Sequence, residues 1–136
     1  MEDLQRDLIK YRNYSPKQTR FSRGARRLLK TNRYDALLLE AASSLSKRFN
    51  DKLGLIRSWG AVDEKKNFLV IPDNMMNLEL LVWASKESGN PKYLDMAINH
   101  ANTTMKNHFR EDYTTCHLVD YVPGTGEVNK KITVQG

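Results

Sequence analysis

The sequence predicts an all-α domain built of αα-hairpins, with short β pieces in the loops between the helices. Apolar residues recur at helical spacing in three segments, at residues 34–49, 74–86 and 90–107. The first and third segments open alike, because Asn32-Arg33-Tyr34 is echoed by Asn90-Pro91-Lys92-Tyr93 at an offset of about 58 residues. A unit of two helices and their loops fits that offset, which favours stacked hairpins.

The first predicted helix runs from about Tyr34 to Phe49. Asn32 stands where a helix N-cap is expected, and Asn50-Asp51 follows the last apolar position as a stop signal. We therefore place this helix between two polar boundaries.

The second and third helices are separated by a short break. The second begins at about Asn74, directly after Pro72-Asp73, and ends at Ser88-Gly89-Asn90. Asn90 can cap the third helix, and Pro91 suits its first turn because the missing N–H has no partner to lose there. The third helix is expected to reach about residue 107.

The loops carry aromatic and polar side chains. Residues 53–60 follow the first helix, and residues 113–136 follow the third. The second loop contains the turn Pro123-Gly124-Thr125-Gly126 between the strand-like segments HLVDYV and KKITV. Such loops gather at one end of a helical domain, where we expect a site.

Composition limits the class of protein. The chain has 136 residues, of which 40% are hydrophobic and 28% charged, which suits a soluble globular domain. Cys116 is its single cysteine, so neither an internal disulfide nor a cysteine metal cage is expected. No apolar run approaches the roughly 18 residues of a membrane span, and the N-terminus lacks signal-peptide features. As written, the chain is expected to be cytoplasmic, with a periplasmic location open if the N-terminus is truncated.

Charge divides the chain into two parts. Residues 1–33 hold ten Lys and Arg against three acids, whereas residues 34–136 hold twelve against thirteen. Only Tyr11, Tyr14 and Phe21 interleave the basic block, and it contains no nucleic-acid-binding motif. We therefore predict a solvated basic segment at 1–33 ahead of a domain at 34–136, with no nucleic-acid or membrane partner.

Two residues are candidates for chemistry or binding. Asp73 precedes a helix, so its carboxylate can cap the exposed N–H groups, or it can act as a general acid if burial or a second carboxylate raises its pKa. Trp59 lies in a loop that Gly54 and Gly60 bound. Its indole can fill the core or offer a flat platform to a sugar ring. The residues alone leave both pairs of alternatives open.

The three histidines do not predict a metal site. His100 and His108 are eight residues apart on one predicted helix, and no cluster of carboxylates at ligand spacing accompanies them. His117 lies beside Cys116 in the final loop, but adjacent residues of an extended strand point to opposite sides. We expect structural or solvent-facing roles for the first two, and neither a metal nor an organic cofactor.

Several motifs in a fixed order resemble one enzyme family. The string IPDNMMNLELL at residues 71–81 resembles the Asp-centred motif of glycoside hydrolase family 88, the unsaturated glucuronyl hydrolases. The similarity extends over about residues 34–136. Its other parts are AASSLSKRFN at 41–50, IRSW at 56–59, SGNPKY at 88–93, NHANTT at 99–104, FRED at 109–112, His117, the turn at 123–126 and Gln135-Gly136.

The resemblance implies a fold, an activity and residue roles. The fold is an (α/α)6 toroid, of which this chain supplies a part. The activity is removal of a Δ4,5-unsaturated uronic acid from the non-reducing end of glycosaminoglycan-type oligosaccharides, by hydration of the C4=C5 bond. Asp73 corresponds to the catalytic proton donor. Trp59 is implied to pack on the uronate ring, with His117 and Gln135 as further substrate-binding residues.

The sequence departs from the family at several positions. The family's second Asp belongs to an upstream His-Asp pair, yet no His precedes His100. A Trp-x-Arg element is expected after Gly136, and Val134 and Val122 replace a His and an Asp. We therefore expect an incomplete chain that does not turn over substrate alone and that self-associates through exposed apolar faces. The alternatives are an unsaturated rhamnogalacturonyl hydrolase and a non-catalytic carbohydrate-binding or interaction remnant of the same scaffold.

Overall fold

A computed structural model describes residues 34–133. The predicted basic segment 1–33, the cap at Asn32 and the candidate Gln135 lie outside the described residues. Along the chain, the described elements are α3 (Asp35–Ser46), β1 (Phe49–Asn50), β2 (Leu55–Ile56), β3 (Phe68–Val70), the 3-10 helix η1 (Pro72–Asn77), α4 (Leu78–Ser88), α5 (Lys92–His108), β4 (Leu118–Tyr121) and β5 (Val128–Ile132).

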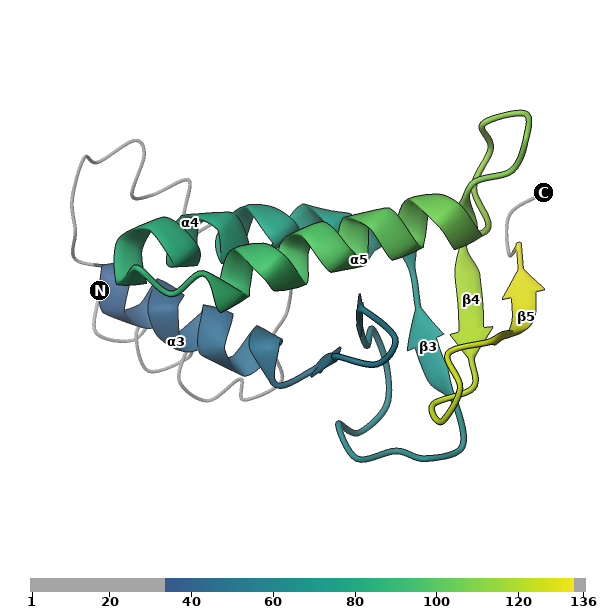
Figure 1. Ribbon diagram of the computed structural model, residues 1–136, viewed down its shortest axis with the longest axis horizontal. Helices are drawn as coiled ribbons and strands as arrows, with labels where there is room; N and C mark the ends of the chain where they lie inside the picture. Colours follow the sequence, from purple (N-terminus) through teal and green to yellow (C-terminus); the bar gives the residue numbers. More distant parts are fainter. Residues whose placement is uncertain (1–33, 134–136) are drawn as a thin grey trace, which may run out of the picture.

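The three described α-helices form one body, and the larger sheet lies at its far end. In Figure 1, α3, α4 and α5 pack side by side, and α5 runs from the α4 turn to the strands β3, β4 and β5. The fold expected from the sequence is therefore found in part: the described residues form helices with small antiparallel sheets. Among these residues, no helix is long and apolar enough to cross a bilayer.

The helices form where the apolar spacing predicts them. On α3, Leu38, Ala42 and Leu45 are buried at intervals of four and three residues. On α4 the buried residues are Leu80, Leu81 and Ala84. The buried residues of both helices form one hydrophobic core with Ile56 and Ala97. The apolar helix faces that the sequence predicts are therefore the faces that pack together.

The break between α4 and α5 also agrees with the sequence. Gly89 ends α4 in the left-handed conformation at φ 70°, which costs a glycine little. The capping position of α5 is Pro91 rather than the predicted Asn90, although the Oδ1 of Asn90 accepts a hydrogen bond from the Lys92 N–H at 3.1 Å. Pro91 then leads into α5 with helical dihedral angles.

Two predicted helix boundaries are wrong. The first helix ends at Ser46 rather than Phe49, because Phe49 and Asn50 pair as strand β1 with Ile56 and Leu55. The second predicted helix starts as the 3-10 helix η1, and its α-helical part begins only at Leu78. The pairing of β1 with β2 sets the first boundary, and the helical spacing of apolar residues up to Phe49 does not reveal it.

The three-stranded sheet has β4 in its centre. β4 pairs antiparallel with β3, with Val70 opposite Val119, and with β5, with Leu118 opposite Ile132. The predicted turn at residues 123–126 connects β4 to β5, whereas β3 has no counterpart in the sequence prediction. A second core lies under this sheet, made of Leu53, Leu55, Phe68, Val70, Cys116, Val119 and Tyr121.

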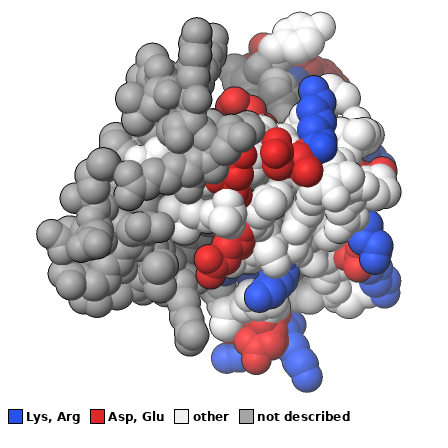
Figure 2. Space-filling model, turned by 90° about the vertical axis from the view of Figure 1, so that its left-hand side faces the viewer, with Lys and Arg blue, Asp and Glu red and all other residues white. Residues whose placement is uncertain are grey.

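Charge on the described residues is mixed. On the face that Figure 2 shows, the described acidic side chains lie among basic and uncharged ones. This arrangement fits the near balance of acids and bases in residues 34–136.

Candidate functional site

The loop that carries Trp59 is held by a half-buried arginine. The guanidinium of Arg48 donates hydrogen bonds to the carbonyl oxygens of Arg57 at 2.9 Å, Ser58 at 3.2 Å and Gly60 at 3.1 Å. These carbonyls flank Trp59 on both sides. Burial, and then the neighbouring Arg57, lower the pKa of Arg48 from its ordinary value.

Arg57 stabilises the rest of the same loop through hydrogen bonds from its side chain. Its side chain is 3% exposed, and it donates to the carbonyl oxygens of Asn67 and Glu64, both at 2.8 Å. The guanidinium also lies over the Phe68 ring, 4.5 Å from its centroid. Burial lowers the pKa of Arg57, with Glu64 as the largest opposing charge. The loop from residue 57 to residue 67 is thereby closed on itself.

Trp59 does not fill the core. Its side chain is 46% exposed, although the backbone on both sides is held by Arg48. A large aromatic side chain exposed on a fixed loop is typical of a binding platform. Of the two alternatives that the sequence leaves open, the core plug is wrong.

Asp73 does not cap a helix. It lies in the first turn of η1, whose capping position is Ile71, and no side chain caps that end. The Asp73 side chain is exposed, and it makes no hydrogen bond or ion pair with residues 34–133. Among the described residues, the Asp73 carboxyl is therefore exposed and without a polar partner.

A buried polar network joins the backbone at Trp59 to the backbone at Asp73. The Nδ2 of Asn74 donates to the Ile56 carbonyl at 2.8 Å and to the Ser58 Oγ at 2.9 Å. Ser58 Oγ also accepts from the Ile71 N–H at 2.9 Å. Ser58 and Asn74 are the direct chain neighbours of Trp59 and Asp73, so these hydrogen bonds connect the two backbone segments that carry the candidate residues.

His117 lies at the same end of the sheet. Val70, the last residue of β3, pairs with Val119, so His117, which directly precedes β4, lies at the end of the sheet from which the chain continues to η1 and Asp73. The His117 side chain is half-buried. Gln135 follows β5, whose last pairing is Ile132 with Leu118, but its own position lies outside the described residues.

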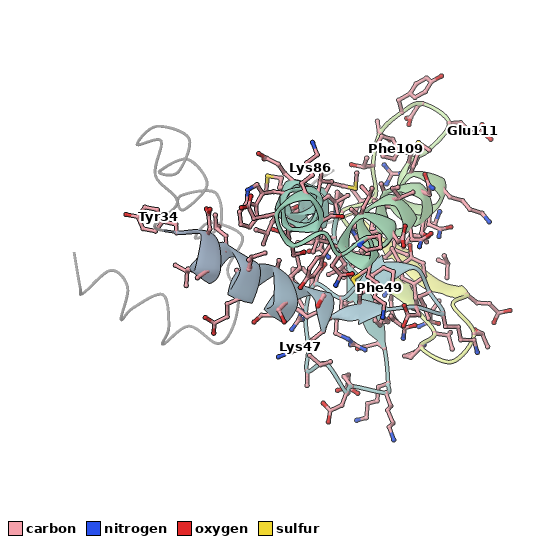
Figure 3. The ribbon with its side chains drawn as sticks, turned by 60° about the vertical axis from the view of Figure 1, so that its left-hand side comes forward. Tyr34, Lys47, Phe49, Lys86, Phe109 and Glu111 are labelled. Carbon is pink, nitrogen blue, oxygen red and sulfur yellow. The ribbon has the colours of Figure 1, made fainter. Side chains whose placement is uncertain are left out.

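The loop between α5 and β4 borders this end of the sheet. Figure 3 shows Phe109 and Glu111 in that loop, at the opposite end of the molecule from Tyr34. Arg110 donates to the Thr114 Oγ1 at 2.9 Å and to the Thr115 carbonyl at 3.3 Å, and it also contacts the Thr133 hydroxyl after β5. The contact with Thr133 connects this loop to the end of β5, beside the start of β4 at Leu118.

His100 and His108 are structural, as the sequence predicts. His100 is fully buried and its Nδ1 accepts from the Ile56 N–H at 3.1 Å. Burial, and then His108, lower the pKa of His100 to about 4. His108 is also fully buried, with its Nδ1 at 3.2 Å from the Cys116 carbonyl. Within residues 34–133, no three His, Cys, Asp or Glu side chains are grouped to hold a metal.

Three residues of the site have no counterpart in the sequence prediction: Arg48, Ser58 and Asn74. Their contacts join residues 9 to 18 positions apart, which local patterns do not reveal. One signal was present for Asn74, because Asn74 and Asn77 are polar residues three apart at the start of an otherwise apolar helix. Both are buried, and the polar atoms of a buried amide are nearly always hydrogen-bonded.

Comparison with known proteins was made by sequence and by structure. No family model matches the chain. An unsaturated glucuronyl hydrolase of Formosa agariphila is 46% identical over 103 residues, which are 76% of this chain and 26% of that protein. An unsaturated chondroitin disaccharide hydrolase of Streptococcus pyogenes serotype M1 is 38% identical over 110 residues, 81% of this chain and 28% of that protein.

Solved structures agree with these relatives. The crystal structure of an unsaturated glucuronyl hydrolase specific for heparin aligns with a TM-score of 0.76 and 44% identity, covering 85% of this chain and 30% of that one. The enzyme of the same name from Streptococcus agalactiae aligns with a TM-score of 0.81 and 26% identity, covering 98% of this chain and 36% of that one. The chain is thus a partial-length homologue of the unsaturated glucuronyl hydrolases, spanning about a quarter to a third of their length.

Proposed function

We propose that this chain carries the Asp73 segment of a glycosidase that acts on a Δ4,5-unsaturated uronic acid at the non-reducing end of glycosaminoglycan-type oligosaccharides. The observation that carries the proposal is the exposed Trp59 on a loop hydrogen-bonded to the turn that presents Asp73. The sequence relatives support the substrate class, because one is an unsaturated chondroitin disaccharide hydrolase.

The proposed reaction is a hydration. The Asp73 carboxylic acid gives its proton to C4 of the unsaturated ring, and a water molecule adds at C5 and returns a proton to the carboxylate. The resulting hemiketal opens and releases the remaining sugar. Protonation of carbon near neutral pH requires an acid that burial or a second carboxylate keeps protonated. The bound substrate would cover the exposed Asp73.

The other candidate residues have binding roles in this proposal. Trp59 packs its indole against the apolar face of the uronate ring, which is a favourable use of an exposed aromatic side chain. His117 and Gln135 orient the uronate and the water. The proposed steps use side chains and water alone.

We further propose that residues 34–136 are part of an (α/α)6 toroid, preceded by the basic segment 1–33. The alignment to 36% of the Streptococcus agalactiae enzyme at a TM-score of 0.81 supports this placement. The antiparallel packing of neighbouring helices such as α4 and α5 is also what a ring of αα-hairpins requires.

The test is binding and turnover of unsaturated chondroitin disaccharide by the full chain. Binding is measured by calorimetry, and turnover by loss of the ultraviolet absorbance of the C=C bond over long incubations. We expect Trp59→Ala to weaken binding about tenfold. Asp73→Asn should lower any turnover by about a hundredfold or more, whereas Asp95→Asn, an exposed acid on α5, should change neither.

The outcomes separate the alternatives. An absence of both binding and turnover would refute the proposal, and turnover that survives Asp73→Asn would refute the role of Asp73. Binding that depends on Trp59 without turnover would instead indicate the carbohydrate-binding alternative.

A further inference from the structure

We propose that Asn74 and Ser58 are positioning residues, which fix the indole of Trp59 relative to the carboxyl of Asp73. The inference rests on the proposed function, since it assigns these two side chains to that site. It adds a role for residues that touch neither the sugar nor the reacting atoms.

The amide of Asn74 is fully engaged and buried. Its Nδ2 donates to the Ile56 carbonyl at 2.8 Å and to the Ser58 Oγ at 2.9 Å, and its Oδ1 accepts from the Asn77 Nδ2 at 3.3 Å. The Ile56 carbonyl can only accept, so it fixes which end of the amide faces it. Asn74 is 6% exposed and Asn77 is 4% exposed. The side chain therefore has one arrangement that satisfies its partners.

Ser58 makes the remaining hydrogen bonds of the network, through its hydroxyl and its backbone N–H. Its Oγ accepts from the Ile71 N–H and from Asn74, and its own N–H donates to the Leu69 carbonyl at 2.8 Å. The residue before Trp59 is thus held through both backbone and side chain. All of these partners lie within five residues of Asp73 along the chain.

Neither candidate residue fixes its own position by polar contacts. Within residues 34–133, the side chains of Trp59 and Asp73 make no hydrogen bond. Their separation is therefore set by the backbone that carries them. Arg48 binds backbone carbonyl oxygens of the Trp59 loop. The side-chain hydrogen bond between Asn74 and Ser58 connects the same loop to η1.

The positional role has a consequence for binding. A sugar ring that packs on an indole while its double bond meets a carboxyl needs both groups at a fixed spacing, and a misplacement of about 1 Å can cost a hundredfold in rate. Hydrogen bonds buried beneath the site are the means by which a scaffold keeps such spacing. Loss of the network should loosen Trp59 before it unfolds the helices.

The experiment is fluorine NMR of the full chain labelled with fluorotryptophan, which gives one resonance for Trp59 and one for Trp83. Trp59→Phe assigns the two. Asn74→Asp keeps the shape but replaces both donors by an acceptor facing the Ile56 carbonyl, and Ser58→Ala removes only the hydroxyl. Ser58→Thr retains that hydroxyl, and Asn102→Asp makes the same change at an exposed position of α5.

We expect Asn74→Asp and Ser58→Ala to broaden or shift the Trp59 resonance and to leave the Trp83 resonance in place. Their affinity for unsaturated chondroitin disaccharide should fall about tenfold. Ser58→Thr and Asn102→Asp should stay within about twofold of the parent affinity. Should Asn74→Asp fail to fold, Ser58→Ala decides the matter alone.

An unchanged Trp59 resonance in the folded variants would overturn the proposal. If the resonance moves but the parent chain binds no disaccharide, the positioning network stands and the proposed function fails. If the parent chain binds but the variants bind equally well, Asn74 and Ser58 do not position the site.

Discussion

Replacement of His100 by Asn should flatten the pH dependence of the chain's stability. His100 is fully buried, and its Nδ1 accepts from the Ile56 N–H at 3.1 Å, with its Nε2 at 3.5 Å from the Thr104 hydroxyl. Protonation of Nδ1 would turn this acceptor into a donor facing another donor. The Oδ1 of Asn can replace Nδ1 as the acceptor without taking up a proton.

The magnitude follows from the pKa of His100, which burial and then His108 lower from 6.5 to about 4. Above pH 6.5 the imidazole is neutral in both the folded and the unfolded chain, so its contribution to stability is complete. As the pH falls toward 4, the unfolded chain takes up a proton that the folded chain refuses. The free energy of unfolding then falls by about 3 kcal/mol, since each pKa unit is worth about 1.4 kcal/mol.

Urea unfolding followed by circular dichroism measures this difference. The two proteins are compared at a series of pH values from above 6.5 down to about 4. At neutral pH the variant should be less stable by about 1–2 kcal/mol because it loses ring packing. As the pH falls toward 4 the two curves should cross, because the loss of about 3 kcal/mol in the parent exceeds the deficit of the variant. Groups that do not interact with His100 affect both proteins alike, so their effect cancels in the comparison. Curves that stay parallel across this range would refute the reasoning.

Three other substitutions test the packing and the loops by the same urea assay. Tyr113 has a positive φ of 64°, so Tyr113→Gly should raise the free energy of unfolding by about 0.5–1 kcal/mol, whereas Glu111→Gly should lower it. Leu80 is fully buried and Leu94 is 40% exposed, so Leu80→Ala should cost about 2–5 kcal/mol and Leu94→Ala less than about 1 kcal/mol. Arg48→Met loses three carbonyl partners and should cost about 1–3 kcal/mol; a smaller loss would mean that water replaces the guanidinium.

The parts of the fold that the sequence predicts are those with local causes. Gly89 and Asn90 end one helix and begin the next through contacts within two residues of each other. The turn at residues 123–126 likewise lies between two strands that pair with each other. Strand β3 is different, because Phe68 pairs with Tyr121 across more than 50 positions. A strand of three residues is too short for its own apolar pattern to predict a pairing partner so far away in the sequence.

The motif order singles out Trp59, Asp73 and His117 as candidates, and their roles stay predictions. The geometry around them could not be predicted from the sequence. The exposure of Trp59 and the absence of a cap at Asp73 come from tertiary contacts. The start of η1 shows why: Asn74 turns its amide toward Ile56 and Ser58, so the residues ahead of α4 follow that network rather than helix propensity.

The contacts that organise the site are confined to a short stretch of chain. Arg48, Ser58 and Asn74 hold the backbone on either side of Trp59 through side-chain hydrogen bonds, and the backbone groups that they bind lie between residues 56 and 71. The backbone around Trp59 is therefore held by residues within the described part of the chain. The proton transfer is a different matter, because an exposed carboxyl such as Asp73 needs further burial or a second carboxylate to act as an acid near neutral pH. Substrate affinity and turnover should therefore respond separately: changes at Asn74 or Ser58 should lower both, whereas Asp73→Asn should lower turnover with little loss of affinity.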